Sequence, residues 1–314
     1  MPFLALASAT RESRLAVAGT RWAAILSARP DLEPAVALQR RLIGLVVDLA
    51  ETLDHARLPR LSLPPRYLAA KLARGVPVLA GEPIPLPVAA LTPTLLRLCE
   101  ELSQGGAGEA GDHIRTALLE ARLDTGSLLT ASLARERTAV RAGAANLGLA
   151  ADLLWLVAEL AVSPFAHALL RMLLATAADE TALAGALAAW THGYCPGCGS
   201  WPALAEILPG QRVLRCSFCA LAWEANPAAC VYCGAQVESL AVEAPGAGHR
   251  NRRVELCTVC QGYLKAVGTD ELLPFPLIAI ADMATIDLDM LAMERGGSRP
   301  SLKAFTPRRS GAPR

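Results

Sequence analysis

The stretch Cys195-Pro196-Gly197-Cys198 opens a block of Cys-x-x-Cys pairs that decides the fold of the second half of this 314-residue chain. The later pairs are Cys216 and Cys219, Cys230 and Cys233, and Cys257 and Cys260. Two residues between cysteines let the chain turn so that both sulfurs point at one ion, and two such turns complete a tetrahedron. The eight thiolates therefore predict two metal sites with four sulfur ligands each, which hold rubredoxin-type iron or zinc.

Chain order indicates which pairs combine. Pairing in sequence closes shorter loops than interleaved pairing, which gives it a small entropic advantage. Gly199 and Gly234 follow the first and third pairs, whereas Ala220 and Gln261 follow the others, which indicates one unit repeated twice. We therefore expect a first site and a second site with these ligands: Cys195, Cys198, Cys216 and Cys219, then Cys230, Cys233, Cys257 and Cys260.

Each unit is expected to be a β ribbon with a Cys-x-x-Cys turn at either end. Residues Gln211 to Arg215 are the predicted return strand of the first ribbon. In the second ribbon, strands over Gln236–Glu243 and Arg252–Leu256 should flank a turn at Pro245–Gly248. Such small sheets have almost no core, so we expect the metals to supply folding free energy, on the order of 10 kcal/mol per site.

Upstream of Trp190 the chain is rich in Ala and Leu and reads as helices around a buried core. Its prolines predict two interruptions. The segment Leu58–Leu86 is expected to be an extended connector, and Ser163-Pro164 should stop one helix and start another. We interpret His167, in an apolar run, as a hydrogen-bonded core histidine.

These patterns predict a mainly α fold in four parts. Residues 1–190 form a helical N-terminal domain, and two tandem rubredoxin-like or zinc-ribbon β modules follow at 191–225 and 226–268. Residues 269–314 form a short C-terminal helical segment and a flexible tail.

Composition narrows the class of partner and the compartment. Lys and Arg number 30 against 29 Asp and Glu, so the chain has no global attraction for nucleic acid or anionic lipid. Met1–Thr10 lacks the basic and apolar parts of a signal peptide, and polar residues interrupt the apolar stretch Ala182–Ala205. We therefore expect a cytoplasmic protein without a membrane span, in which cysteines bind metal rather than form disulfides.

Two other functions stay open at this point. One is a zinc-ribbon module that binds nucleic acid or the transcription machinery, and the other is a thiol oxidoreductase. Arg250, Arg252 and Arg253 cluster at the predicted ribbon tip, either as a solvated turn or as a contact for RNA or an acidic partner. Acidic residues balance the basic ones across the ribbons, which disfavours nucleic acid, and metal-loaded cysteines are not free nucleophiles.

The cysteine block resembles the formate dehydrogenase accessory protein FdhE family. The matching runs are Cys195-Pro196-Gly197-Cys198-Gly199-Ser200, Leu214-Arg215-Cys216-Ser217-Phe218-Cys219 and Cys230-Val231-Tyr232-Cys233. Outside it, the similar segments are Gly262-Tyr263-Leu264-Lys265 after the last cysteine pair, Asp287–Gly296 as a C-terminal helix, and Gly81–Leu86 as a proline strap.

The resemblance implies a cytoplasmic assembly factor that is not an enzyme. Members of this family bind the catalytic subunit of formate dehydrogenase and support its maturation before export. They carry rubredoxin-like iron, and redox sensing through that iron is a hypothesis that the resemblance and the four-sulfur sites motivate. A binding role agrees with the residues, because no nucleophile in the sequence is paired with a base.

Overall fold

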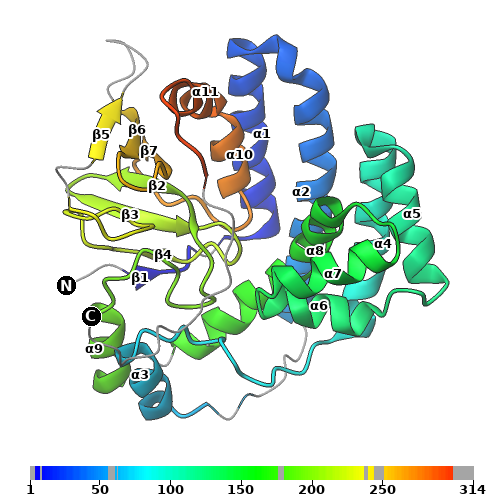
Figure 1. Cartoon of the computed structure of the whole chain (residues 1–314), viewed down its shortest axis with the longest axis horizontal. Helices are drawn as coiled ribbons and strands as arrows, with labels where there is room; N and C mark the ends of the chain where they lie inside the picture. The colour runs from blue at the N-terminus through cyan, green and yellow to red at the C-terminus, as the bar shows by residue number, and fades with distance from the viewer. Residues whose placement is uncertain are drawn as a thin grey trace.

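Nine α-helices lie in the described part of the chain up to Ala188, and several of them pack around the longest, α8 (Figure 1). The computed structural model describes residues 4–7, 9–55, 61, 63–175, 180–236, 240–243 and 251–299. The helices are α1 (Arg11–Ala28), α2 (Glu33–His55), α3 (Pro65–Ala73), α4 (Val88–Leu102), α5 (Glu109–Leu119), α6 (Thr125–Leu133), α7 (Arg137–Asn146), α8 (Ala151–Ala175) and α9 (Thr181–Ala188). Short η turns lie at Pro30–Leu32 and Ser103–Ala107.

Helix α8 is the centre of the helical core, with α2, α4, α6 and α7 packed against it. Within the described ranges it alone is long and apolar enough to cross a membrane, and 78% of its apolar window is buried inside the protein. The predicted helix stop at Ser163-Pro164 is wrong, because α8 runs through Pro164. Buried packing on both sides of Pro164 offsets the backbone hydrogen bond that a proline removes.

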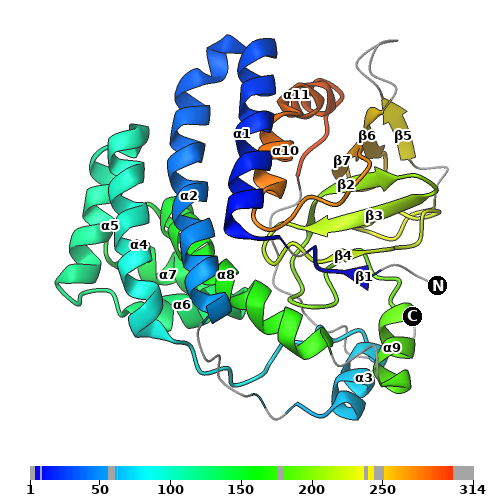
Figure 2. The ribbon, with the colours of Figure 1, turned by 180° about the vertical axis from the view of Figure 1, so that it is seen from behind.

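The prediction of an extended connector over Leu58–Leu86 is also wrong in part, because α3 lies inside it. Pro65 occupies the first turn of α3, where its missing amide hydrogen leaves no bond unmade. Helix α3 packs against α9 at the foot of the molecule, in both Figure 1 and the reverse view of Figure 2. Pro65 therefore marks the start of helix α3, whereas the later prolines of this segment lie in the extended stretch after that helix.

Both cysteine units contribute to one seven-stranded sheet in the described residues. Its strands are β1 (Leu4–Ala5), β2 (Pro202–Leu208), β3 (Gln211–Cys216), β4 (Ala222–Trp223), β5 (Leu240–Glu243), β6 (Arg252–Cys257) and β7 (Tyr263–Gly268). The order across the sheet is β1-β4-β3-β2-β7-β6-β5. Antiparallel pairs β2–β3 and β5–β6 are the two ribbons, and the parallel pair β2–β7 joins them.

The predicted return strands over Gln211–Arg215 and Arg252–Leu256 are confirmed to within one residue at their ends. Of the predicted strand over Gln236–Glu243, residues from Leu240 onward form β5, and residues 237–239 lie outside the described ranges. The predicted turn at Pro245–Gly248 also lies outside them.

Two short helices, α10 (Ile278–Met283) and α11 (Ile286–Glu294), complete the described chain. Helix α10 contacts both α1 and β2, and α11 packs on β6 and β7, so this segment lies between the helices and the sheet (Figure 2). The mainly α fold class with two cysteine ribbons is confirmed. The domain limits stay predictions, and residues 300–314 of the expected flexible tail lie outside the described part.

A buried ion pair links the first ribbon to the segment that precedes α10. Glu206 on β2 and Arg215 on β3 are 2% and 0% exposed, and the guanidinium contacts the carboxylate. Arg215 also donates to the Leu273 carbonyl at 2.6 Å, while the Leu273 amide donates to Glu206 at 3.2 Å. Burial raises the pKa of Glu206 and lowers that of Arg215, so each charge depends on the other.

Glu206→Ala is expected to lower the free energy of unfolding by about 3–5 kcal/mol, because it leaves the Arg215 guanidinium buried without a counter-charge. Urea unfolding followed by circular dichroism measures the change. Glu294→Ala on the exposed end of α11 is the matched control and should change stability by less than about 0.5 kcal/mol. Equal effects from the two substitutions would contradict the role given to the pair.

Candidate metal centres

Each Cys-x-x-Cys pair lies in a tight turn, called a knuckle here, and the backbone is alike in all four. The amide of the first cysteine donates to the carbonyl oxygen five residues later, at 2.7–2.9 Å. The residue after the second cysteine has a positive φ in every knuckle, between 57° and 81°. Ala220 and Gln261 adopt this conformation at a cost of about 1–2 kcal/mol each, so all four turns need it, with or without glycine.

The knuckles bring the eight cysteines into two groups of four. Within each group all sulfurs lie within 4.8 Å of one another, and the groups are those expected from chain order. Sulfurs are 3.4 Å apart for Cys198–Cys216 and 3.6 Å for Cys195–Cys219. They are 3.8 Å apart for Cys230–Cys260 and 3.7 Å for Cys233–Cys257.

These separations fit a metal ion and exclude disulfides. Zinc–sulfur bonds of about 2.3 Å place the corners of a tetrahedron about 3.8 Å apart. A disulfide requires sulfurs about 2.05 Å apart, and all eight cysteines are free. Each group can therefore hold one ion, and four thiolates suit zinc and rubredoxin-type iron alike.

Backbone amides point at several of the sulfurs, as expected for thiolate ligands. The amides of Phe218 and Cys219 donate to Cys216 Sγ at 3.4 Å, and that of Gly262 donates to Cys260 Sγ at 3.4 Å. Burial raises the pKa of Cys195 and of Cys219 well above the usual value for a thiol. A cation at the centre of the group would reverse that effect, because it favours the charged thiolates.

The first site lies inside the main hydrophobic core. Its four cysteines are at most 5% exposed and belong to the same cluster as Phe218, Leu221 and Trp223. His167 of α8 bonds through Nδ1 to the Cys219 carbonyl at 2.9 Å and stacks on Phe275, which confirms it as a core residue. The expectation of ribbons with almost no core is therefore wrong for the first unit, because α8 packs against it.

A loop after α3 supports the first knuckle, and sequence reasoning missed it. The amides of Val78 and Leu79 donate to the carbonyl oxygens of Pro196 and Gly197 at 2.8 and 2.9 Å. The buried Lys71 ammonium holds this loop by donating to the Val78 carbonyl at 2.9 Å and pairing with Glu82. In the sequence, the nearest signal is the proline-containing segment Gly81–Leu86, which resembles the family's proline strap.

The second site is partly open. Cys230 and Cys257 are buried, whereas Cys233 and Cys260 are exposed. Desolvation raises the pKa of Cys257, but hydrogen bonds from the amides of Cys260 and Val259, together with those of the Cys233 and Cys230 side chains, lower the pKa to about 7. Tyr232 anchors the third knuckle, with its ring 5.3 Å from that of Trp201 and its hydroxyl donating to the Tyr263 carbonyl at 3.1 Å.

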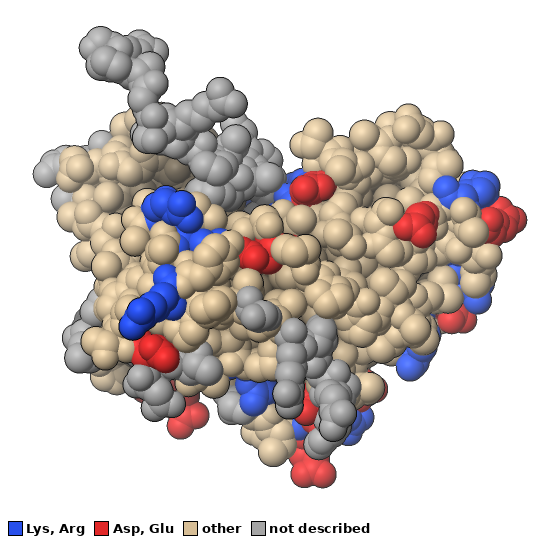
Figure 3. All heavy atoms as spheres, turned by 90° about the horizontal axis from the view of Figure 1, so that it is seen from below, with Lys and Arg blue, Asp and Glu red and all other residues tan. Residues whose placement is uncertain are grey.

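Two of the three arginines predicted at the ribbon tip lie in the described part of the chain, and both form ion pairs. Arg252 pairs with Asp287, and Arg253 pairs with Glu255 at 3.1 Å. Arg250 lies outside the described residues. Figure 3 shows basic side chains in separate groups beside acidic ones on one face of the molecule. Because both described arginines are paired with carboxylates, the interpretation of this cluster as an RNA contact is the less favoured one.

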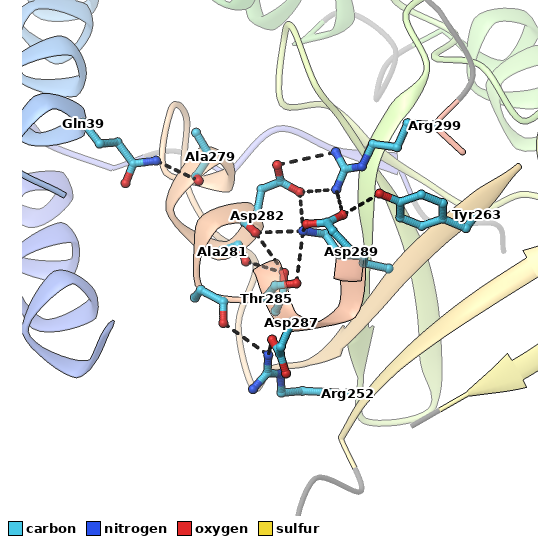
Figure 4. A network of polar contacts seen from close by, with 12 residues as sticks. Gln39, Arg252, Tyr263, Ala279, Ala281, Asp282, Thr285, Asp287, Asp289 and Arg299 are labelled. Atoms are coloured by element: carbon cyan, nitrogen blue, oxygen red, sulfur yellow. Dashed lines mark hydrogen bonds and ion pairs between the residues drawn. The ribbon is translucent and has the colours of Figure 1, made fainter. Parts of the chain in front are cut away.

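Two segments that resemble family motifs meet in a polar network (Figure 4). Lys265 on β7 is fully buried and pairs with Asp282 at 2.8 Å and with Asp289 on α11 at 2.7 Å. The Tyr263 hydroxyl donates to Asp289 at 2.8 Å, and Arg299 donates to the same carboxylate at 2.9 Å. The network fastens α10 and α11 to the strand that follows the last knuckle.

Comparison with known proteins agrees with this geometry. No protein-family model matches the chain. A protein FdhE homolog of Stutzerimonas stutzeri (strain A1501) is 36% identical over 112 residues, which are 33% of this chain and 35% of that protein. A protein FdhE homolog of Aquifex aeolicus (strain VF5) is 32% identical over 114 residues, 34% of this chain and 39% of that protein. The resemblance to the FdhE family is confirmed.

The FdhE fold extends beyond the aligned segments, which span under two fifths of those relatives. The crystal structure of the FdhE protein from Pseudomonas aeruginosa matches 98% of this chain and 99% of its own, with a TM-score of 0.58 and 24% identity. The overall fold of this chain is therefore shared with that solved structure.

Gly193→Ala is expected to weaken the contact between the two cysteine units. A Cβ atom on Gly193 would lie 1.8 Å from the carbonyl oxygen of Val231 in the third knuckle. Relieving that overlap should cost about 1–3 kcal/mol of unfolding free energy, measured in urea. Gly143→Ala in α7 is the control, because no heavy atom lies within 4 Å of its added Cβ. Equal stability of the two variants would rule out this close approach.

Proposed function

We propose that this chain is a metal-binding accessory factor for formate dehydrogenase. It binds the catalytic subunit of that enzyme in the cytoplasm and supports its maturation before export. Its own role is binding rather than catalysis. Each four-cysteine site holds iron or zinc through its thiolates, and iron would allow the protein to respond to redox state.

The observation that carries this proposal is the combination of an FdhE fold with two complete sulfur groups. Either feature alone is compatible with many functions, since folds host unrelated activities. Here the two groups of sulfurs lie within a fold that resembles that of the solved FdhE protein. Sites with four protein ligands have no open position for a substrate, which supports a structural or sensing role for the metals.

The charged groups on the ribbons support a protein partner over nucleic acid. Nucleic-acid-binding modules present unpaired Lys and Arg in a stripe or patch. The described arginines of the second ribbon, Arg252 and Arg253, are both paired with carboxylates. The face in Figure 3 likewise shows both signs of charge interspersed.

Affinity capture of the catalytic subunit of formate dehydrogenase tests the proposal. The full chain should retain this subunit, and Cys216→Ser should lose most of it, because an incomplete first site cannot hold the surrounding core. Cys99→Ala is the matched control, because Cys99 is a buried cysteine of α4 outside both sites. It should bind like the unchanged protein.

Circular dichroism of each variant shows whether the helices persist. Capture of the subunit by a folded Cys216→Ser protein at the unchanged level would contradict a metal-dependent role. Failure of the unchanged protein to capture it, combined with salt-sensitive RNA binding, would favour the zinc-ribbon alternative.

A further inference from the structure

The two four-cysteine sites differ in how far the protein shields their sulfurs from water. In the first site all four cysteines are buried, and Cys195 and Cys219 are 0% exposed. In the second site Cys233 and Cys260 are exposed. Two of the four ligand residues of the second site therefore lie at the surface, where a small chelator can approach them.

Segments far apart in the sequence enclose the first site. Val78 and Leu79 hold its first knuckle through backbone hydrogen bonds. Leu170 of α8 packs so closely on Gly197 that an added Cβ would lie 2.8 Å from its side chain. The guanidinium of Arg135 lies 4.2 Å from the ring centre of Phe218, and Phe218 belongs to the second knuckle, between Cys216 and Cys219 in the sequence. Exposing these sulfurs requires opening the helical core, the most costly kind of local unfolding.

The second site has much less protein around it. Its ribbon has a separate small core of Val254, Leu256, Tyr263 and Ala292. Val259, between the last two cysteines, is 66% exposed. Figure 1 shows β5 and β6 at the outer end of the sheet, away from α4 to α8. Local opening of one knuckle is enough to release an ion there.

We infer that the two sites bind metal with different kinetics and serve different purposes. The first site keeps its ion as a permanent part of the core, while the second takes up and releases its ion reversibly through Cys233 and Cys260. The second site is therefore the place where the protein exchanges a soft metal ion or meets a thiol-reactive compound. This inference rests on the metal binding in the proposed function but not on the dehydrogenase partner.

Zinc release from the full chain, loaded with two zinc ions, tests the inference. The chromogenic chelator 4-(2-pyridylazo)resorcinol is added in excess and its zinc complex is followed over time. One equivalent should appear at least about tenfold faster than the other, since local opening is more frequent than core opening. Release of both ions at one rate would overturn the inference.

Two matched variants assign the phases. Cys233→Ser should remove the fast phase and leave one slowly released zinc, whereas Cys198→Ser should remove the slow phase.

Iodoacetamide labelling of the unchanged protein in the presence of chelator is a second measurement. Mass spectrometry should show that the cysteines of the second site are modified before those of the first site. This second measurement decides the matter even if Cys198→Ser fails to fold. Earlier labelling of the first site would overturn the inference. It would not contradict the proposed function, which the capture of the dehydrogenase subunit tests separately.

Discussion

Four sulfur atoms brought together inside a hydrophobic core impose the strongest constraint on this molecule. Two similar turns bring these sulfurs together, and as thiolates they repel one another unless a cation lies between them. In the first site Cys195 and Cys219 belong to the same hydrophobic cluster as Leu169 and Leu170 of α8, and His167 of α8 bonds to the Cys219 carbonyl. Metal ion, ribbon and helices should therefore form one cooperative unit, in which loss of the ion is felt beyond the ribbon.

The sheet extends that unit to the rest of the chain. Parallel pairing of β2 with β7 turns two ribbons into one sheet, and Gly193 allows the third knuckle to pack directly against the first unit. Buried charges then fix the sheet to its surroundings, with Arg215 holding the segment before α10 and Lys265 holding α11. A binding surface built on the middle of this sheet would be rigid, since buried ion pairs tie β2, β3 and β7 to their neighbours.

Cysteine spacing was enough to predict the two groups of sulfurs and the return strands, because the ligand geometry is set by local turns. The same local reasoning failed where contacts between distant segments determine the structure. Pro164 was expected to end a helix, yet buried neighbours carry α8 through it. The support from Val78 and Leu79 joins segments more than a hundred residues apart, so no local pattern could reveal it. The core around the first site was missed for the same reason, since composition cannot show which helix covers a ribbon.

X-ray absorption spectroscopy with metal analysis, on the full chain purified under reducing conditions, measures directly how many metal ions the protein holds and which atoms bind them. We expect two metal ions per chain, each surrounded by four sulfur atoms at about 2.3 Å. Fewer than two ions per chain, nitrogen or oxygen ligands in place of sulfur, or disulfides among the eight cysteines would contradict it.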